Sequence, residues 1–137
     1  MAQTVHRSNN KYAYVISLGS TRRGLRLPSC GFPAYPGPMV EQSKWMAQVE
    51  RNPGHSQWYV ERFRTMAAEG QDIVGEARLV DAMLPRGARV LDAGCGPGRL
   101  AGYLHGVGHH VTGVDVDPAL IAAAKRDHPG PRYEVAD

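Results

Sequence analysis

Apolar residues recur at helical spacing in three stretches before residue 86, and each stretch predicts a helix: residues 38–52, 57–70 and 72–85. We expect Ser56 to cap the second helix, which places Tyr59 and Phe63 on one face. Aromatic side chains in such a stripe most often pack into a core, so we expect packing rather than ligand contact for Tyr59 and Trp58. The third helix should end at Pro85, because proline lacks the amide that a helix needs.

After residue 87 the pattern changes to short apolar runs that alternate with helical segments. We predict strands at residues 88–94, 110–116 and 132–137, and helices at residues 98–109 and 117–130. Asp117 can cap the second of these helices, and Pro118 fits its first position. A β-α-β-α-β order with short connections favours parallel strands and right-handed crossovers. The sequence therefore predicts an α/β fold with a parallel sheet, preceded by N-terminal helices.

The first 38 residues differ from the rest in charge and composition. They contain no Asp or Glu, five basic residues and four of the ten prolines, so the net charge of +3 comes from this segment. Such a segment cannot easily bury its backbone, and we expect a disordered leader outside the fold. It lacks the amphipathic period of a transit peptide and the cleavage site of a secretory signal. We favour a translation start at Met39, and a functional basic tail is the alternative.

The composition restricts the classes of protein to which the chain can belong. With 137 residues, 42% hydrophobic and 21% charged, it is long enough for one globular domain, and no apolar run has membrane-spanning length. Cys30 and Cys95 do not form a disulfide framework, which indicates a reducing, cytoplasmic compartment. The six histidines lack the spacing of metal ligands, so we expect exposed or partly buried side chains and no metal site.

The segment VLDAGCGPGRL, residues 90–100, is the strongest candidate for a binding site. It follows the first predicted parallel strand and precedes a helix, which is where ligands bind in folds of this class. Its glycines indicate a tight turn that a ligand approaches closely. A dinucleotide fingerprint would need a glycine at Arg99, and Asp92 would repel a pyrophosphate. A ligand with a cationic group fits Asp92 better.

Residues 87–137 resemble the first half of the class I S-adenosylmethionine-dependent methyltransferases, which have a Rossmann-like fold. The family's first motif consists of two apolar residues, an acidic residue and three alternating glycines, and it is matched here by Val90, Leu91, Asp92, Gly94, Gly96 and Gly98. Asp115 matches the acidic residue that ends the family's second strand, and Asp137 matches the aspartate after the third. Three motifs in order and at the expected spacings make the resemblance specific.

The resemblance implies S-adenosylmethionine as the cofactor and assigns roles to these residues. The three loop glycines would let the main chain approach the methionine part and the ribose. Asp115 would accept hydrogen bonds from both ribose hydroxyls, Val116 would press on the adenine ring, and Asp137 would accept from the exocyclic amine of adenine. Asp92 would arrange the loop and the ammonium end of the cofactor.

The resemblance also implies methyl transfer to a nucleophilic acceptor, with any catalytic base in a region that follows the fourth strand. We therefore assign no catalytic residue and no acceptor. Two alternatives stay open: a nicotinamide-dependent oxidoreductase, and a non-catalytic module that binds RNA or an acidic surface through its basic tail. The tail has no aromatic-basic repeat for stacking on bases, so we expect no nucleic-acid partner. Because no apolar run has membrane-spanning length, we expect no membrane partner either.

The resemblance further implies a truncated domain. The family's first strand is central in its sheet, and this sequence supplies only the first three strands. The strand at residues 88–94 would then lie at an open edge, which favours self-association by edge pairing. We thus expect a leader at residues 1–38, helices at residues 39–86, and the first half of a cofactor-binding domain at residues 87–137.

Overall fold

A computed structural model of the chain describes residues 7–8, 11–12, 14–17 and 43–136. Its helices are α1 (Lys44–Arg51), α2 (His55–Ala68), α3 (Gly75–Met83), α4 (Arg99–Gly106) and α5 (Pro118–Asp127). Its strands are β1 (Arg7–Ser8), β2 (Lys11–Tyr12), β3 (Tyr14–Ser17), β4 (Arg89–Ala93), β5 (His110–Asp115) and β6 (Arg132–Val135). Within these ranges no helix is long and apolar enough to cross a membrane.

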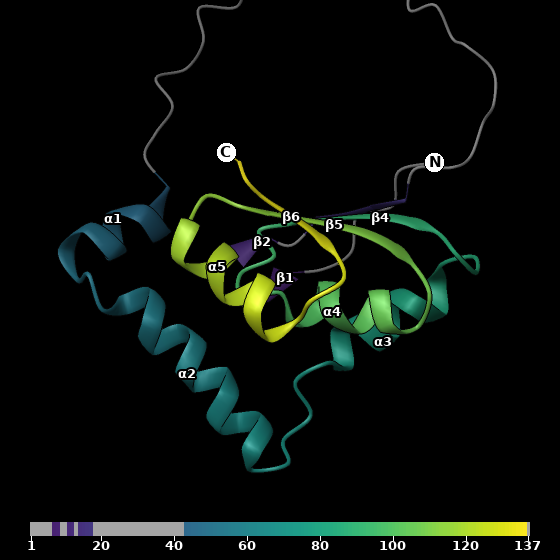
Figure 1. Ribbon diagram of the computed structural model, residues 1–137, viewed down its shortest axis with the longest axis horizontal. Coiled ribbons are helices and arrows are strands. Elements are labelled where there is room, and N and C mark those ends of the chain that lie inside the picture. Colours follow the sequence, from purple (N-terminus) through teal and green to yellow (C-terminus); the bar gives the residue numbers. More distant parts are fainter. Residues whose placement is uncertain (1–6, 9–10, 13, 18–42, 137) are drawn as a thin grey trace, which may run out of the picture.

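Three parallel strands form the sheet that the sequence predicts. β5 lies between β4 and β6 and pairs with both in parallel. Helices α4 and α5 form the two crossovers, and Figure 1 shows α3, α4 and α5 along one face of the sheet. The carboxyl ends of β4 and β5 meet at one edge of the sheet, where Ala93 pairs with Val114. This edge is where a doubly wound fold binds its ligands.

The core forms where alternate residues of the strands meet the helices. Val90 of β4, Val111 of β5 and Leu104 of α4 belong to one buried cluster. A second, smaller cluster contains Val60 of α2 and Leu120 of α5 and attaches the N-terminal helices to the sheet domain. Full burial of an aliphatic side chain of this size stabilises a fold by about 1.5–3 kcal/mol. The predicted helical stripes and buried strands are thus the surfaces that pack together.

β4 is not an edge strand, which corrects the expectation from the sequence. β3 pairs with it in antiparallel orientation over four residues, with Val15 opposite Asp92. β-Branched residues in β3 favour a strand, and an open β4 edge offers unpaired amides and carbonyls. The expected disordered leader is therefore wrong for residues 14–17, and also for β1 and β2, which pair with each other. The remaining positions of residues 1–38 lie outside the described residues.

Most helix ends lie within three residues of the prediction, but α1 begins at Lys44 rather than at residue 38, and α2 has a different cap. Ser43 caps α1 by accepting a backbone hydrogen bond, Asp117 caps α5, and α3 ends before Pro85. The predicted cap of α2 is wrong, because Gly54 takes the cap position and makes no side-chain hydrogen bond there. Ser56 lies inside the helix instead, where its buried hydroxyl donates to a residue far away in the sequence.

His109 is the histidine that departs most from the expectation of exposed or partly buried side chains. It is 2% exposed, and its Nδ1 accepts a hydrogen bond of 3.1 Å from the Ala88 amide. Because Nδ1 is an acceptor, Nε2 carries the proton and donates to Asp81 Oδ1 at 2.9 Å. The ring therefore connects α3 to the starts of β4 and β5, at the end of these strands opposite the glycine-rich loop.

Candidate functional site

The glycine-rich loop joins the end of β4 to the start of α4. Its three alternating glycines all have positive φ, with values of 77° at Gly94, 56° at Gly96 and 82° at Gly98. Any other residue in this left-handed region would be destabilised by about 1–2 kcal/mol. The amides of Gly94 and Cys95 donate to the Val114 carbonyl at 2.8 and 2.9 Å. These bonds fasten the loop to the neighbouring strand, β5.

The glycines of the loop differ in what surrounds them. A Cβ atom at Gly98 would lie 2.7 Å from the Tyr133 hydroxyl and 2.8 Å from the Ala124 Cβ, so packing inside the protein requires this glycine. A Cβ atom at Gly96 would meet the Tyr59 ring at 3.7 Å, which is an ordinary contact. We expected all three glycines to be required by the close approach of a ligand. Gly98 differs, because packing against Tyr133 and Ala124 inside the protein already requires a glycine there.

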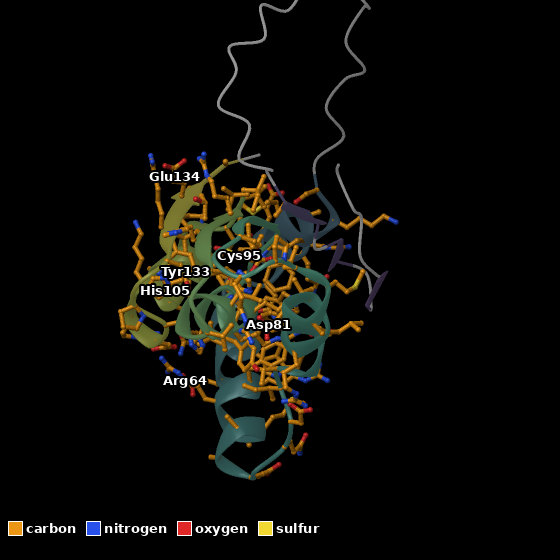
Figure 2. The ribbon with its side chains drawn as sticks, turned by 90° about the vertical axis from the view of Figure 1, so that its right-hand side faces the viewer. Arg64, Asp81, Cys95, His105, Tyr133 and Glu134 are labelled. Atoms are coloured by element: carbon orange, nitrogen blue, oxygen red, sulfur yellow. The ribbon has the colours of Figure 1, made fainter. Side chains whose placement is uncertain are left out.

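Two residues fill the interior next to the loop. Cys95 and Tyr133 are both buried and lie close to each other (Figure 2), and each would collide with a Cβ atom at Gly113 of β5. The Tyr133 hydroxyl donates to the His128 carbonyl at 3.0 Å. Burial raises the pKa of Tyr133, so the ring stays neutral and serves as packing.

Asp115 ends β5 beside the loop, where the sequence expects it. The residue is buried, and each of its carboxylate oxygens accepts a backbone hydrogen bond, from Gly96 at 2.8 Å and from Asp117 at 3.0 Å. These two amides fix the orientation of the carboxylate. A carboxylate oxygen has a second lone pair with which it can accept from a ligand. The arrangement is a fixed anion at the end of the sheet, suited to a pair of hydroxyl groups.

Asp92 lies deeper in the protein than a simple contact with a ligand would require. It is 1% exposed, and neither carboxylate oxygen makes a hydrogen bond of normal geometry within the described part of the chain. Burial raises the pKa of Asp92 to about 6, and the positive charge of Arg99 and the backbone amide of Ala101 offset only part of this effect. A buried carboxylate with so little hydrogen bonding is costly. A cationic ligand group near the loop would lower that cost.

Arg99 is a site residue that the sequence analysis did not single out for binding. It opens α4, where the helix dipole disfavours a positive charge. Its guanidinium donates to the Ile73 carbonyl, pairs with Glu76 at 2.7 Å and lies 4.8 Å from the centre of the Phe63 ring. Contacts from α2 and from the start of α3 thus hold a cation beside the buried Asp92.

Aromatic residues of α1 and α2 form a cluster that reaches the same loop through Tyr59. The ring of Tyr59 lies 5.0 Å from that of Trp45 and 5.0 Å from that of Phe63. Tyr59 also reaches Gly96, and burial raises its pKa, with a smaller contribution from the negative charge of Asp115. The expected core packing holds in part for Tyr59, which is half-buried, but Trp58 is 54% exposed. The spacing of Tyr59 and Phe63 predicted that they share one face of α2. It did not predict that Tyr59 lies next to the glycine-rich loop.

The remaining predicted site residues follow the ends of β5 and β6. Val116 comes directly after Asp115 and is partly buried. The Ala136 amide donates to the Asp115 carbonyl at 3.1 Å, so the end of β6 lies next to Asp115. Asp137 lies outside the described residues. Among the residues that the structure describes, no group of three or more His, Cys, Asp or Glu side chains is placed to hold a metal ion.

The loop and the Asp115 carboxylate coincide with a match to known proteins. A family model described as a methyltransferase domain matches residues 90–137. This stretch has the fold of the class I S-adenosylmethionine-dependent methyltransferases. The predicted family, its α/β fold and S-adenosylmethionine as the cofactor of the family are confirmed. The roles of the individual site residues stay predictions.

Similar proteins agree with the methyltransferase assignment. The solved structure of a TehB-like S-adenosylmethionine-dependent methyltransferase from Corynebacterium glutamicum is 59% identical, with a TM-score of 0.60, over 63% of this chain and 47% of that one. A malonyl-[acyl-carrier protein] O-methyltransferase of Enterobacter lignolyticus is 39% identical over 45% of this chain and 27% of its own length. A ubiquinone biosynthesis O-methyltransferase of Xylella fastidiosa is 54% identical over 28% of this chain and 16% of its own. The chain thus spans about a quarter of the first curated relative and about half of the solved one.

Proposed function

We propose that residues at the carboxyl ends of β4 and β5 bind S-adenosylmethionine, and that the protein transfers the methyl group to an acceptor. The observation that carries this proposal is the Asp115 carboxylate, buried and fixed by the Gly96 amide, within the stretch that matches the methyltransferase family. A carboxylate accepts several hydrogen bonds, and one that is fixed at the end of the sheet is the kind of acceptor that suits the two hydroxyls of the cofactor's ribose. Two relatives are named O-methyltransferases, which supports an oxygen atom as the acceptor.

The surroundings of the loop fit the other parts of the cofactor. The buried Asp92 makes no hydrogen bond of normal geometry within the described residues and would stabilise the cationic groups of the methionine part. The positive φ of Gly96 turns the loop amides towards Asp115 and leaves its Cα side to Tyr59. Val116 would contact the adenine ring, and Asp137 would accept from its exocyclic amine. Tyr59 is added to the predicted set because its ring lies against the loop.

The proposed chemistry asks mainly for positioning. S-adenosylmethionine, when bound, supplies an electrophilic methyl group on a sulfonium. The residues of this chain would hold that group in a fixed orientation. This lowers the barrier, because the reactants then lose their translational and rotational freedom on binding rather than in the transition state. No residue of the chain is assigned as a catalytic base, and the acceptor has no assigned chemical class beyond an oxygen nucleophile.

Isothermal titration of the 137-residue chain tests the proposal. S-adenosylmethionine and its demethylated product, S-adenosylhomocysteine, should bind with a stoichiometry near one, and NAD should not bind. Binding of NAD alone would overturn the proposal in favour of an oxidoreductase. Salt-sensitive RNA binding that is lost on removal of residues 1–38, without any response to S-adenosylmethionine, would favour the binding module.

We also propose a cytoplasmic location for the protein. The support is the low cysteine content, because two cysteines among 137 residues do not form the disulfide framework that small secreted domains carry. Fractionation of cells that express the tagged chain tests this proposal. Recovery with the membrane or secreted fraction would contradict it.

A further inference from the structure

Two side chains from the N-terminal helices meet on one carboxylate of the sheet domain. The indole N–H of Trp45, in α1, donates to Asp117 Oδ2 at 2.7 Å, and the Ser56 hydroxyl, in α2, donates to the same oxygen at 2.5 Å. Ser56 and Asp117 are buried, at 4% and 2% exposure. Hydrogen bonds to a charged acceptor that is shielded from water are the stronger ones in proteins.

The same aspartate continues into the proposed cofactor site. Its backbone amide donates to Asp115 Oδ1 at 3.0 Å, and the other oxygen of Asp115 accepts from the Gly96 amide at 2.8 Å. A continuous series of hydrogen bonds therefore runs from Trp45 and Ser56 through Asp117 to Asp115 and the loop. Every link lies at normal hydrogen-bond distance.

This series helps to hold the aromatic residues of the N-terminal helices in place, together with the apolar cluster that contains Val60 and Leu120. Trp45 packs against Tyr59 at 5.0 Å between ring centres, and Tyr59 lies against Gly96 of the loop. Releasing Trp45 and Ser56 from Asp117 would free the start of α2 and withdraw Tyr59 from the loop. The position of these helices and the shape of the site are therefore linked.

We propose that Asp117 is a positioning residue that couples the docking of α1 and α2 to the binding of a nucleoside ligand at Asp115. The proposal rests on the proposed function, because it takes S-adenosylmethionine as that ligand. Coupling of this kind is reciprocal: if docking of the helices strengthens ligand binding by a given factor, ligand binding strengthens docking by the same factor. Asp117 itself touches neither the reacting group nor the loop.

A simple helix cap does not account for the whole arrangement. Asp117 caps α5 through Oδ1, which accepts from the Ala119 amide at 2.8 Å. An asparagine would cap α5 equally well. The second oxygen, Oδ2, accepts the hydrogen bonds from Trp45 and Ser56. A cap alone would not require a full negative charge to be buried at this oxygen.

The structure offers a matched control at the other end of α2. Arg64 of α2 (Figure 2) binds Asp127 of α5 through two nitrogens, at 2.8 to 3.2 Å. This pair also joins α2 to α5, but Asp127 is at the opposite end of α5 from Asp117. Asp127→Asn therefore weakens the same helix contact without touching the hydrogen bonds that reach Asp115.

The first experiment measures the affinity of S-adenosylhomocysteine by calorimetry. Asp117→Asn keeps the cap but points an amide at two donors, and we expect binding about tenfold weaker, within the usual range of coupling between linked sites. Asp127→Asn should bind as the wild type does. Equal affinities of the wild type and Asp117→Asn would overturn the inference. Absence of binding by the wild type would instead contradict the proposed function for this chain.

The second experiment separates positioning from general destabilisation. Trp45→Phe keeps a ring but removes the donor, so the double variant with Asp117→Asn should lose no more affinity than the larger single loss. Additive losses would contradict the inference. In a Trp58→Phe background Trp45 is the one tryptophan, and its emission should shift to longer wavelength in Asp117→Asn but not in Asp127→Asn. This readout needs no ligand, and an unshifted emission in Asp117→Asn would also overturn the inference.

Discussion

Asp92 and Asp115 are two buried carboxylates near one loop, but they differ in their hydrogen bonds. Asp115 accepts two backbone amides, while Asp92 makes no hydrogen bond of normal geometry within the described residues. Burial accordingly raises the pKa of Asp92 from its ordinary 3.8 to about 6. The folded state thus holds the Asp92 proton more tightly than the unfolded chain does. The contribution of this group to the free energy of unfolding falls as the pH rises from 4 through about 6.

Asp92→Asn should therefore stabilise the ligand-free protein at pH 8, and by only about a third as much at pH 4.5, because the folded state still holds the Asp92 proton there while most of the unfolded chain has lost it. The shift corresponds to an upper bound of about 3 kcal/mol at the higher pH, and relaxation of the surroundings reduces it. Urea unfolding of both proteins at the two pH values measures the effect. An equal change at both pH values would show that the charge of Asp92 does not act in this way.

Asp115→Ala should weaken the binding of S-adenosylmethionine by about 1.5–3 kcal/mol, the range for hydrogen bonds to a charged group. The variant also leaves the Gly96 amide without its acceptor, so a moderate loss of stability should accompany the effect. Calorimetry measures the affinity, with Asp72→Ala as a control because Asp72 is an exposed carboxylate that pairs with Arg78. Unchanged affinity would remove Asp115 from the cofactor site.

Two neighbouring glycines of the loop should respond differently to alanine. Gly96→Ala meets an ordinary contact with Tyr59, so its loss of stability should stay near the left-handed backbone cost of about 1–2 kcal/mol. Gly98→Ala adds a collision with Tyr133 and Ala124, and we expect about 1–3 kcal/mol more. Thermal and urea unfolding compare the two variants. A larger loss for Gly96→Ala would contradict the packing role of Gly98.

At the level of helices and strands, His109 connects three elements through its two ring nitrogens. His109→Leu would leave the Ala88 amide and the Asp81 carboxylate without this partner, and we expect the free energy of unfolding to fall by about 2–4 kcal/mol. His110→Leu is the control, because its side chain is exposed. The affinity for S-adenosylmethionine should stay unchanged, since His109 lies at the opposite end of the strands. A loss of affinity with unchanged stability would contradict this structural role.

The elements after residue 88 were predictable because their signals are local. Short apolar runs bury one face of each strand, and Asp117 with Pro118 marks the start of α5 within two residues. The links between elements were not predictable in this way. Ser56 and Asp117 are 61 residues apart, and no pattern in the sequence pairs them. The same holds for His109, whose burial depends on α3, 28 residues before it.

In the candidate site, too, the residues with a local sequence signal were predictable and those brought in by distant elements were not. The motif spacing placed the glycines and Asp115 at the end of the sheet, where the structure brings them together. Arg99 was read as a departure from a dinucleotide motif, although it contacts Glu76 and the Phe63 ring beside Asp92. A loop motif can be recognised from the sequence because its residues are nearly consecutive. The side chains that α2 and α3 place beside that loop cannot be recognised in this way, because their positions depend on tertiary packing.

For the whole molecule, the decisive contact is the pairing of β3 with β4. The sequence predicted that residues 1–38 form a disordered leader outside the fold, because they contain no acidic residue and lack an amphipathic period. In the structure, β3 occupies the edge of β4 over four residues, beside the strand that leads into the glycine-rich loop. The basis for self-association through that edge is thereby removed in the presence of β3, since paired amides and carbonyls are not offered to a second chain.

Removal of residues 1–38 should therefore lower the midpoint of thermal unfolding and cause association that increases with protein concentration. The physical reason is that the amides and carbonyls of the exposed β4 edge can pair with another copy. Light scattering after size exclusion measures the association, and a chain starting at residue 14 is the control, because it keeps β3 but loses β1 and β2. A monomeric 39–137 chain with unchanged thermal midpoint would show that the strand pairing of β3 adds nothing to the stability of the sheet.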